Sequence, residues 1–211
     1  MEKFTDVTGP AAALLKPNIN TDLLAPGRRL DRPDPPAAIR TFTENLADNL
    51  LASWRFDRNG EIAEFVLNRE PFRNAKILLA GPNFGCGSSR ETAVMALVQF
   101  GIRCVIATGF GTIFHGNSWK HGLLPISLPL ETVKHLASQA ERNGVALPMT
   151  VSLVDNTITT SGGEVVRFEI AEFRRHALLE GLDDISVTLE RAPEIRKFEE
   201  RDKRQRPWIY A

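Results

Sequence analysis

A glycine-rich turn between two apolar runs constrains the fold of this chain more than any other feature. The turn spans residues 80–91 and follows the apolar run from Ile77 to Ala80. It leads into residues 93–98, where apolar side chains recur at helical spacing, and a second apolar run follows at 104–107. This order of strand, turn, helix and strand predicts a βαβ unit and therefore an α/β fold.

The composition of the turn favours a site for an anion. Its glycines let the backbone come close to whatever lies above it, and Ser88 stands three residues before Glu91, which predicts a capping box at the start of the helix. Free N–H groups at a helix start attract negative charge, and Arg90 adds a guanidinium beside them. The sequence therefore predicts a site for an anion such as a carboxylate.

The residues of the turn exclude most other interpretations of it. A glycine turn with a serine cap is common in α/β proteins and needs no function, so a structural role stays open. The dinucleotide-binding pattern needs a glycine where Arg90 stands, and no Gly-Lys pair of a P-loop follows Gly81. A nucleophile elbow needs a glycine two residues after its serine, which neither Ser88 nor Ser89 has. An anion site with two serines and an arginine remains.

The composition predicts a globular protein with enough chain for one large domain, although two domains are possible, and without a nucleic-acid or membrane partner. The chain has 211 residues, 43% of them hydrophobic, which suffices for a sizeable core. Its formal net charge is 0 at pH 7 with no basic block, which argues against nucleic acid and anionic membranes. The first residues lack a signal-peptide core, so we expect a cytoplasmic protein. In that compartment Cys86 and Cys104 are expected as reduced thiols.

The first third of the chain is less regular in pattern. Residues 8–10 predict a turn, and residues 17–22 predict a polar loop in which Asn20, Thr21 and Asp22 bond their own backbone. Charged and proline-rich residues 28–36 predict an irregular surface loop. Apolar residues recur near helical spacing over 37–54, whereas 62–67 fits a strand or a helix equally well.

The second half predicts strands followed by helices. A strand is expected at 124–128 and a helix at 131–142, closed by Asn143 and Gly144. Alternation of apolar and polar residues predicts an antiparallel meander. Its three strands are expected at 149–155, 157–160 and 164–168.

Helices are expected to the end of the chain. One runs from 172 to 180 and stops at Gly181, and a second begins at the cap Asp183. A solvated helix over 193–206 precedes the apolar tail 207–210, which is expected to pack on this chain or on another.

Ordered matches along most of the chain resemble a known family, the small subunit of isopropylmalate dehydratase, which corresponds to the swivelling domain of aconitase. The specific part is the run from Gly81 to Glu91. The other matches are Asn20-Thr21-Asp22 with Pro26, Leu50 with Trp54-Arg55-Phe56, Phe65 to Asn68, Ala75 with Ile77-Leu78, Gly101-Ile102-Arg103, Ile113-Phe114 with Asn117, and Gly122 to Ile126.

The resemblance implies a fold, an activity and a partner. The fold would be a single swivelling β/β/α domain over 1–211, with a mixed sheet flanked by helices, the turn at an exposed edge, and a terminal helix and apolar tail at 192–211. The activity would be that of a hydro-lyase that moves a hydroxyl group in a 2-hydroxy diacid, serving leucine biosynthesis. In the family a [4Fe–4S] cluster on a large subunit acts as Lewis acid, and two cysteines are too few to ligate one here.

The resemblance also assigns roles to residues. Ser88 would be the general base that takes a proton from the substrate carbon, while Ser89 and Arg90 would hold a substrate carboxylate. Asn83, Thr21, Asp22 and Arg28 complete the expected substrate-binding set. No metal ligands are expected in this chain. A serine hydroxyl acts as a base only if its alkoxide is stabilised, and the helix start, the glycine N–H groups and Arg90 would do so.

Two departures from the family pattern leave the substrate open. Thr92 stands where the family usually has histidine, and the segment after Arg28 differs from its relatives. A related hydro-lyase acting on citraconate, methylmalate, dimethylmalate or a homoaconitase substrate is the nearest alternative, and a non-catalytic carboxylate-binding module is the second. Cys86 with His115 or His121 as a nucleophilic pair lacks any motif, so we interpret Cys86 as a packed thiol. The four histidines show no metal-ligand spacing.

Overall fold

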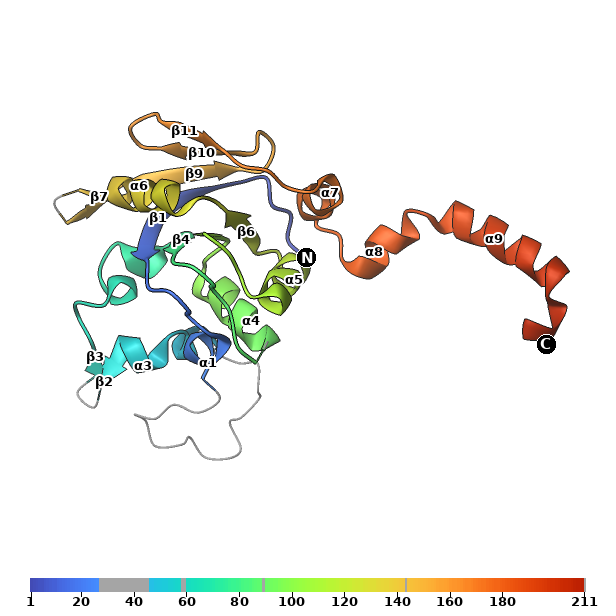
Figure 1. The fold of residues 1–211 in the computed structure, drawn as a ribbon, viewed down its shortest axis with the longest axis horizontal. Coiled ribbons are helices and arrows are strands. Elements are labelled where there is room, and N and C mark those ends of the chain that lie inside the picture. Colours follow the sequence, from blue (N-terminus) through green and yellow to red (C-terminus); the bar gives the residue numbers. More distant parts are fainter. Residues whose placement is uncertain (27–45, 58–59, 89, 143, 211) are drawn as a thin grey trace.

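The computed structural model describes residues 1–26, 46–57, 60–88, 90–142 and 144–210. A curled seven-stranded sheet forms the centre of the body, in the order β11-β10-β9-β1-β4-β5-β6 (Figure 1). Its strands are β1 (Asp6–Leu14), β4 (Ile77–Ala80), β5 (Cys104–Ala107), β6 (Leu124–Ser127), β9 (Pro148–Ser152), β10 (Thr157–Thr160) and β11 (Val165–Arg167).

The sheet is parallel on one side of β1 and antiparallel on the other. β1, β4, β5 and β6 run parallel, with Ala11 beside Ile77 and Ile77 beside Cys104. β9, β10 and β11 form an antiparallel meander that joins β1 through β9. The prediction of a mixed sheet is therefore confirmed, and so are the βαβ unit and the meander. The alternating meander explains why the sheet is not purely parallel.

The helices are mostly short, and their bounds are as follows. The α-helices are α1 (Thr21–Leu24), α2 (Leu46–Asn49), α3 (Ala52–Arg55), α4 (Glu91–Phe100), α5 (Thr112–Lys120), α6 (Leu130–Ala140), α7 (Glu172–Glu180), α8 (Asp184–Leu189) and α9 (Ala192–Gln205). The 3-10 helices are η2 (Val66–Asn68), η3 (Phe72–Asn74) and η4 (Pro207–Ile209). Two small hairpins pair β2 (Phe56–Asp57) with β3 (Gly60–Glu61) and β7 (Glu141–Arg142) with β8 (Val145–Ala146).

Both faces of the parallel strands are buried. Leu78 and Ala80 of β4 face a core that α1, α2 and α4 cover. Ile77 and Leu79 of the same strand face a second core, to which α6 contributes Val133. Successive side chains of a strand point to opposite faces, so a continuous apolar run such as β4 requires cover on both. This explains why the sequence of β4 carries no polar alternation.

Three local predictions are wrong. Residues 8–10 lie inside β1, where Pro10 is paired with Pro148 of β9. Residues 17–22 are not all loop, because α1 begins at Thr21 with Asn20 as its cap. The helix expected at 131–142 ends at Ala140, and the next two residues form β7. Asn143, half of the predicted cap, lies outside the described residues, as do residues 28–36.

The helix expected over 37–54 is interrupted in its described part. From residue 46 the chain forms α2 and then α3, and Leu51 between them has a left-handed φ of 51°. A left-handed residue ends one helix before the next can begin. Residues 37–45 of this prediction lie outside the described part of the chain. Residues 62–67, left unassigned from the sequence, contain the start of η2.

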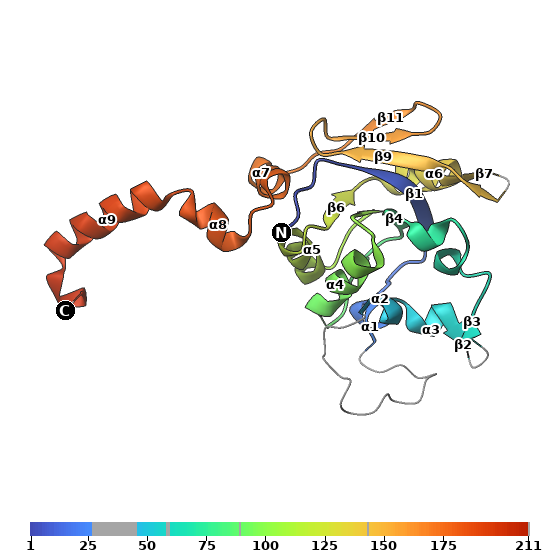
Figure 2. The same ribbon diagram turned by 180° about the vertical axis from the view of Figure 1, so that it is seen from behind.

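The C-terminal helices leave the body of the molecule. α7 ends at Gly181, which has a φ of 69°, and Asp183 caps α8, as predicted. From there α8 and α9 extend away from the sheet, and two opposite views agree on this separation (Figures 1 and 2). No helix in the described ranges is long and apolar enough to cross a membrane.

Candidate functional site

The candidate site lies where three loops meet at the carboxyl ends of parallel strands. These loops follow β1, β4 and β5, which are neighbours in the sheet. In open α/β sheets ligands usually bind outside the carboxyl ends of the strands. The glycine turn singled out in the sequence is the middle loop of the three.

Backbone hydrogen bonds tie the glycine turn to both neighbouring loops. On the β1 side, Gly85 N–H donates to the Ile19 carbonyl at 2.7 Å, and Thr21 N–H donates to the Cys86 carbonyl at 2.9 Å. On the β5 side, Phe84 N–H donates to the Gly109 carbonyl at 3.0 Å. The turn is therefore held on both sides as a continuation of the sheet.

Two glycines adopt backbone conformations that other residues rarely take. Gly85 has a φ of 70° and Gly87 a φ of 96°. A side chain on Gly85 would overlap the ring of Phe114 in α5, so that glycine is needed for space as well as for φ. The sequence predicts that the glycine backbone comes close to another group, and at Gly85 that group is the Phe114 ring.

The predicted capping box at Ser88 and Glu91 is wrong. Helix α4 begins at Glu91, its cap is Arg90 with φ −78° and ψ 121°, and no side chain bonds to the first turn. The chain is still extended at Arg90, so Ser88 stands two residues before the cap rather than at it. The Ser88 side chain is exposed and does not serve as the N-cap of α4.

Arg90 forms an ion pair that crosses from the middle loop to the first. Its Nη2 lies 2.9 Å from Oδ1 of Asp22 in α1. Both side chains are about half exposed, 43% and 53%. Asn20 positions Asp22, because its Oδ1 accepts the Leu23 N–H at 2.8 Å and caps α1. The structure thus brings together two residues that the resemblance placed in one site.

Thr21 lies beneath the turn rather than on its surface. The residue is fully buried, and its hydroxyl oxygen has no hydrogen-bond partner. A Cβ placed on Gly87 would lie 3.7 Å from this oxygen, so the hydroxyl sits directly under the glycine. The expected substrate-binding residue Thr21 therefore supports the loop from below in this structure.

Two further polar contacts surround the turn, and no sequence pattern pairs their members. Asn83 Nδ2 donates to Asn18 Oδ1 at 2.8 Å, and both residues have left-handed φ values. Glu91 Oε1 lies 2.7 Å from Nε2 of His121 at the end of α5. Of these four residues, only Asn83 belongs to the binding set expected from the sequence, and it does so through the resemblance. Ser89 and Arg28 lie outside the described residues.

The cysteines and the remaining histidines do not assemble a reactive centre. Cys104 is buried in β5, and burial raises the pKa of its thiol. Burial also lowers the pKa of the His115 imidazole, and the nearby Arg174 guanidinium lowers it further. No cluster of three or more His, Cys, Asp or Glu side chains in the described part of the chain could hold a metal ion. The described residues therefore do not fit a cluster site.

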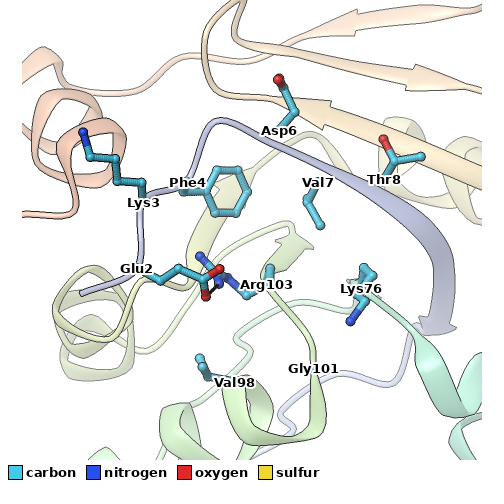
Figure 3. A pocket seen from close by; sticks show the side chains of 10 residues that line it. All are labelled: Glu2, Lys3, Phe4, Asp6, Val7, Thr8, Lys76, Val98, Gly101 and Arg103. Carbon is cyan, nitrogen blue, oxygen red and sulfur yellow. Dashed lines mark hydrogen bonds and ion pairs between the residues drawn. The ribbon is translucent and has the colours of Figure 1, made fainter.

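A cavity of about 470 Å³ lies at the opposite end of the parallel strands (Figure 3). Asp6 at the start of β1, Lys76 before β4 and Arg103 before β5 line it, which places it at the amino ends. Arg103 pairs with Glu2 inside the cavity, and Figure 3 shows these two side chains turned toward one another. Its lining carries charges of both signs and none of the predicted site residues.

Comparisons with known proteins identify the family. The profile of the aconitase C-terminal domain matches residues 1–131, and a profile of the C-terminal domain of 3-isopropylmalate dehydratase small subunits matches residues 184–211. Proteins named 3-isopropylmalate dehydratase small subunit are 47% identical in Jannaschia sp. and 48% identical in Ruegeria pomeroyi. Each alignment spans 211 residues, 99% of this chain and 100% of the relative.

A solved structure supports the same fold. The crystal structure of 3-isopropylmalate dehydratase (LeuD) from Methanocaldococcus jannaschii superposes with a TM-score of 0.60 at 24% identity, covering 91% of this chain and 98% of that chain. The resemblance read from the sequence, and the fold class that it implied, are confirmed. The chain belongs to the family of 3-isopropylmalate dehydratase small subunits.

Proposed function

We propose that this chain works as the small subunit of 3-isopropylmalate dehydratase, a hydro-lyase of leucine biosynthesis. The enzyme would interconvert 2-isopropylmalate and 3-isopropylmalate by removing water and adding it back at the neighbouring carbon. The full-length relatives at 47% and 48% identity carry this proposal. Our further proposals are that residues 1–211 form one domain with a terminal helix and tail at 192–211, and that the protein is cytoplasmic.

The partner in this proposal is a large subunit that holds a [4Fe–4S] cluster. When bound, such a cluster supplies a Lewis acid for the substrate's hydroxyl and carboxylate groups. Cys104 is buried in the sheet and Cys86 has no neighbouring thiol in the turn, which supports placing the cluster on the other chain. The contribution of this chain is then limited to binding the substrate and moving its proton.

Arg90 is the proposed carboxylate clamp. A guanidinium at a helix start opposes the helix dipole, so a nearby anion has to compensate it. In the free chain Asp22 supplies that anion from a half-exposed position. Exposed ion pairs contribute about 0–1 kcal/mol, so a substrate carboxylate that binds in a dry, closed site can replace Asp22 as the partner. Ser89, Asn83 and Arg28 are proposed to complete the set.

Ser88 is the proposed base, and its place in the turn supports that role. Dehydration breaks a C–H bond and a C–O bond on neighbouring carbons. The C–H electron pair becomes the new double bond, and the C–O electron pair leaves with the oxygen as hydroxide, the other half of the water that is lost. The proton goes to the Ser88 oxygen and returns from it when water adds in the other direction. Because Ser88 is exposed and does not cap α4, its hydroxyl is not committed to the helix. Arg90 and the free N–H groups of α4 would stabilise its alkoxide.

Reconstitution tests this proposal. The chain and its large subunit are co-expressed without oxygen, and the absorbance of an unsaturated diacid is followed with 2- and 3-isopropylmalate. We expect turnover by the pair and none by either chain alone. Citraconate, methylmalate, dimethylmalate and homoaconitase substrates are assayed beside them, because Thr92 departs from the family pattern. Preference for one of these would reassign the substrate, and a pair that forms without any turnover would favour a non-catalytic module.

A further inference from the structure

The C-terminal part of the chain carries apolar groups that the body does not cover. We call residues 184–210 the arm; it contains α8, α9 and η4. In both views the far part of the arm lies beside no other element of the body (Figures 1 and 2). Its exposed large apolar residues include Ile185, Leu189, Phe198, Trp208 and Ile209. Trp208 is 71% exposed.

Helix α9 lacks the packing that stabilises most helices of its length. It spans 14 residues, and isolated helices of about 12–15 residues are only marginally stable in water. The hydrogen bonds described for its end stay within the arm. An amphipathic helix gains most of its stability by burying its apolar face, and Phe198 on this helix is half exposed. Helix α9 therefore has the properties of a helix that buries its apolar face on the surface of another molecule.

The tip of the arm is folded into a fixed hook. Asp202 on α9 is only 5% exposed, although it stands on a solvated helix. Its Oδ1 accepts from Arg206 Nε at 2.6 Å, and its Oδ2 accepts from the Tyr210 hydroxyl at 2.8 Å. The Lys203 ammonium lies 5.4 Å from the centre of the Tyr210 ring. These contacts turn η4 back on α9 and leave Trp208 and Ile209 at the outside.

A hook of this kind is suited to binding. Tryptophan, tyrosine and arginine are the side chains that most often dominate the energy of an interface. Because Asp202 already fixes the backbone around Trp208, little conformational entropy remains to be lost when the indole enters a pocket. The arm also supplies about the 20–30 residues that one side of a standard interface needs. The arm thus combines a preorganised Trp208 with enough surrounding residues to form one side of an interface.

We propose that the arm docks on the large subunit, with Trp208 inserted in an apolar pocket of that chain. This inference rests on the proposed function, because it requires the two-subunit enzyme. The profile that matches the body is described for a domain of aconitase, whereas the profile that matches the arm is described for the small subunit. A separate subunit needs a contact outside the shared site to stay bound while the substrate enters and leaves. The arm supplies that contact and leaves the carboxyl edge of the sheet open.

A second copy of this chain is the less suitable occupant. Lys197, Arg201 and Arg204 recur at helical spacing on one face of α9, with Glu200 beside them. In a two-fold dimer the same patch meets itself, so the three cations of each copy would face three more, with one carboxylate from each copy to compensate them. A different chain can offer acidic side chains around the pocket instead. The proposed partner surface is therefore an apolar pocket with an acidic rim.

Binding measurements with the full chain and the purified large subunit test the proposal. The Kd is measured directly, and kcat is measured at saturating small subunit. Trp208→Ala is expected to weaken association at least tenfold and to leave kcat at saturation unchanged. Phe173→Ala, which removes a similarly exposed aromatic from α7, is the control and is expected to change the Kd less than threefold. Asp202→Asn keeps the indole but loosens the hook, so it should weaken association by less than Trp208→Ala.

Each other outcome overturns the proposal. An unchanged Kd in Trp208→Ala would show that the arm is not the docking element, even though the enzyme exists. If Phe173→Ala weakens association with the large subunit as much as Trp208→Ala does, Trp208 is not the specific anchor. A wild-type chain that dimerises alone and loses its dimer with Trp208→Ala would make a second copy the occupant. If the wild-type chain does not bind the large subunit at all, the proposed function fails together with this inference.

Discussion

Arg90 at the cap of α4 and Asp22 in α1 form an ion pair with 2.9 Å between Nη2 and Oδ1. The pair joins loops that follow two neighbouring parallel strands, β4 and β1. A positive charge at a helix start is unfavourable to the helix dipole, and in the free chain the Asp22 carboxylate compensates the charge of Arg90. Because both side chains are about half exposed, the pair contributes little to stability, which supports the proposal that a substrate carboxylate replaces Asp22.

The first prediction concerns the guanidinium of Arg90. Arg90→Lys keeps the charge but loses the planar fork that binds a carboxylate through two hydrogen bonds. We expect kcat/KM of the assembled enzyme to fall about 10–100-fold, the worth of one hydrogen bond to a charged group. The melting temperature should stay within the error of the measurement, because the pair with Asp22 is exposed. Steady-state kinetics and calorimetry on the same preparations check both points.

Arg167→Lys is the matched control for that variant, since Arg167 is exposed on the edge strand β11, away from the turn. It should leave both quantities unchanged. Normal kinetics with a lowered melting temperature in Arg90→Lys would assign Arg90 to the scaffold.

The second prediction separates two glycines. Gly85 has a φ of 70°, and a Cβ there would overlap the Phe114 ring, so Gly85→Ala combines backbone strain with overpacking. We expect a loss of about 2 kcal/mol or more in the free energy of unfolding. Gly116 lies inside α5 and a Cβ there meets nothing within 4 Å. Gly116→Ala should therefore stabilise the chain by about 0.5–1 kcal/mol.

Urea unfolding of the two variants beside the wild type measures both changes. Equal stabilities of Gly85→Ala and the wild type would mean that the turn does not need this conformation.

The third prediction uses Tyr210, the one tyrosine of the sequence. Its hydroxyl donates to Asp202, and this hydrogen bond raises the pKa of Tyr210 above its ordinary value of 10.0. Because the folded-state pKa is raised, the hook is stabilised fully below the ordinary pKa and loses this contribution as the pH rises through the raised value. An ultraviolet titration of phenolate absorbance should therefore show ionisation above pH 10.0 in the wild type.

Asp202→Asn should move that titration back toward 10.0. The folded state of the body is followed by circular dichroism over the same pH range. A tyrosine that ionises at its ordinary pKa in both proteins would show that the hook does not persist in solution.

The fourth prediction covers the acid side of the same contact. The hydrogen bond from Tyr210 lowers the pKa of the Asp202 carboxyl, and Arg206 lowers it further. A lowered folded-state pKa means that the stabilisation is present above the ordinary value of 3.8 and is lost as the pH falls through the lowered one. The hook should thus stay closed on mild acidification. Quenching of Trp208 fluorescence by iodide reports the state of the hook, and Trp208→Phe serves as the blank for the other tryptophans. The quenching should change only below the lowered pKa of Asp202.

The sequence predicted the parts of the fold that local pattern decides. The apolar runs at 77–80 and 104–107 are strands β4 and β5, and the alternating residues after 148 form the meander. Gly181 ends a helix with a left-handed φ, and Asp183 accepts the Ser186 N–H at 2.7 Å as a cap. Each of these features depends on residues that are close together in the sequence.

Other features depend on contacts that no local pattern records. Ser88 and Glu91 have the spacing of a capping box, but Cys86 pairs with Asn20 in the loop after β1, and the cap of α4 is Arg90, whose backbone is extended. Glu141 leaves α6 where Arg69 binds both of its carboxylate oxygens, at 3.2 and 3.0 Å. Asp22 was placed in the site only by resemblance, because it meets Arg90 across two loops that lie far apart in the sequence.

Ser88→Ala in the assembled enzyme tests the central claim most directly. If Ser88 moves the substrate proton, its loss should lower kcat about 10²–10⁴-fold, the usual worth of general acid–base catalysis, while the Kd between subunits stays the same. The melting temperature should not change, since Ser88 does not cap α4. Ser161→Ala, in an exposed turn after β10, is the control. A kcat of Ser88→Ala within about threefold of the wild type, in a pair that assembles normally, would contradict the assignment of proton transfer to this chain.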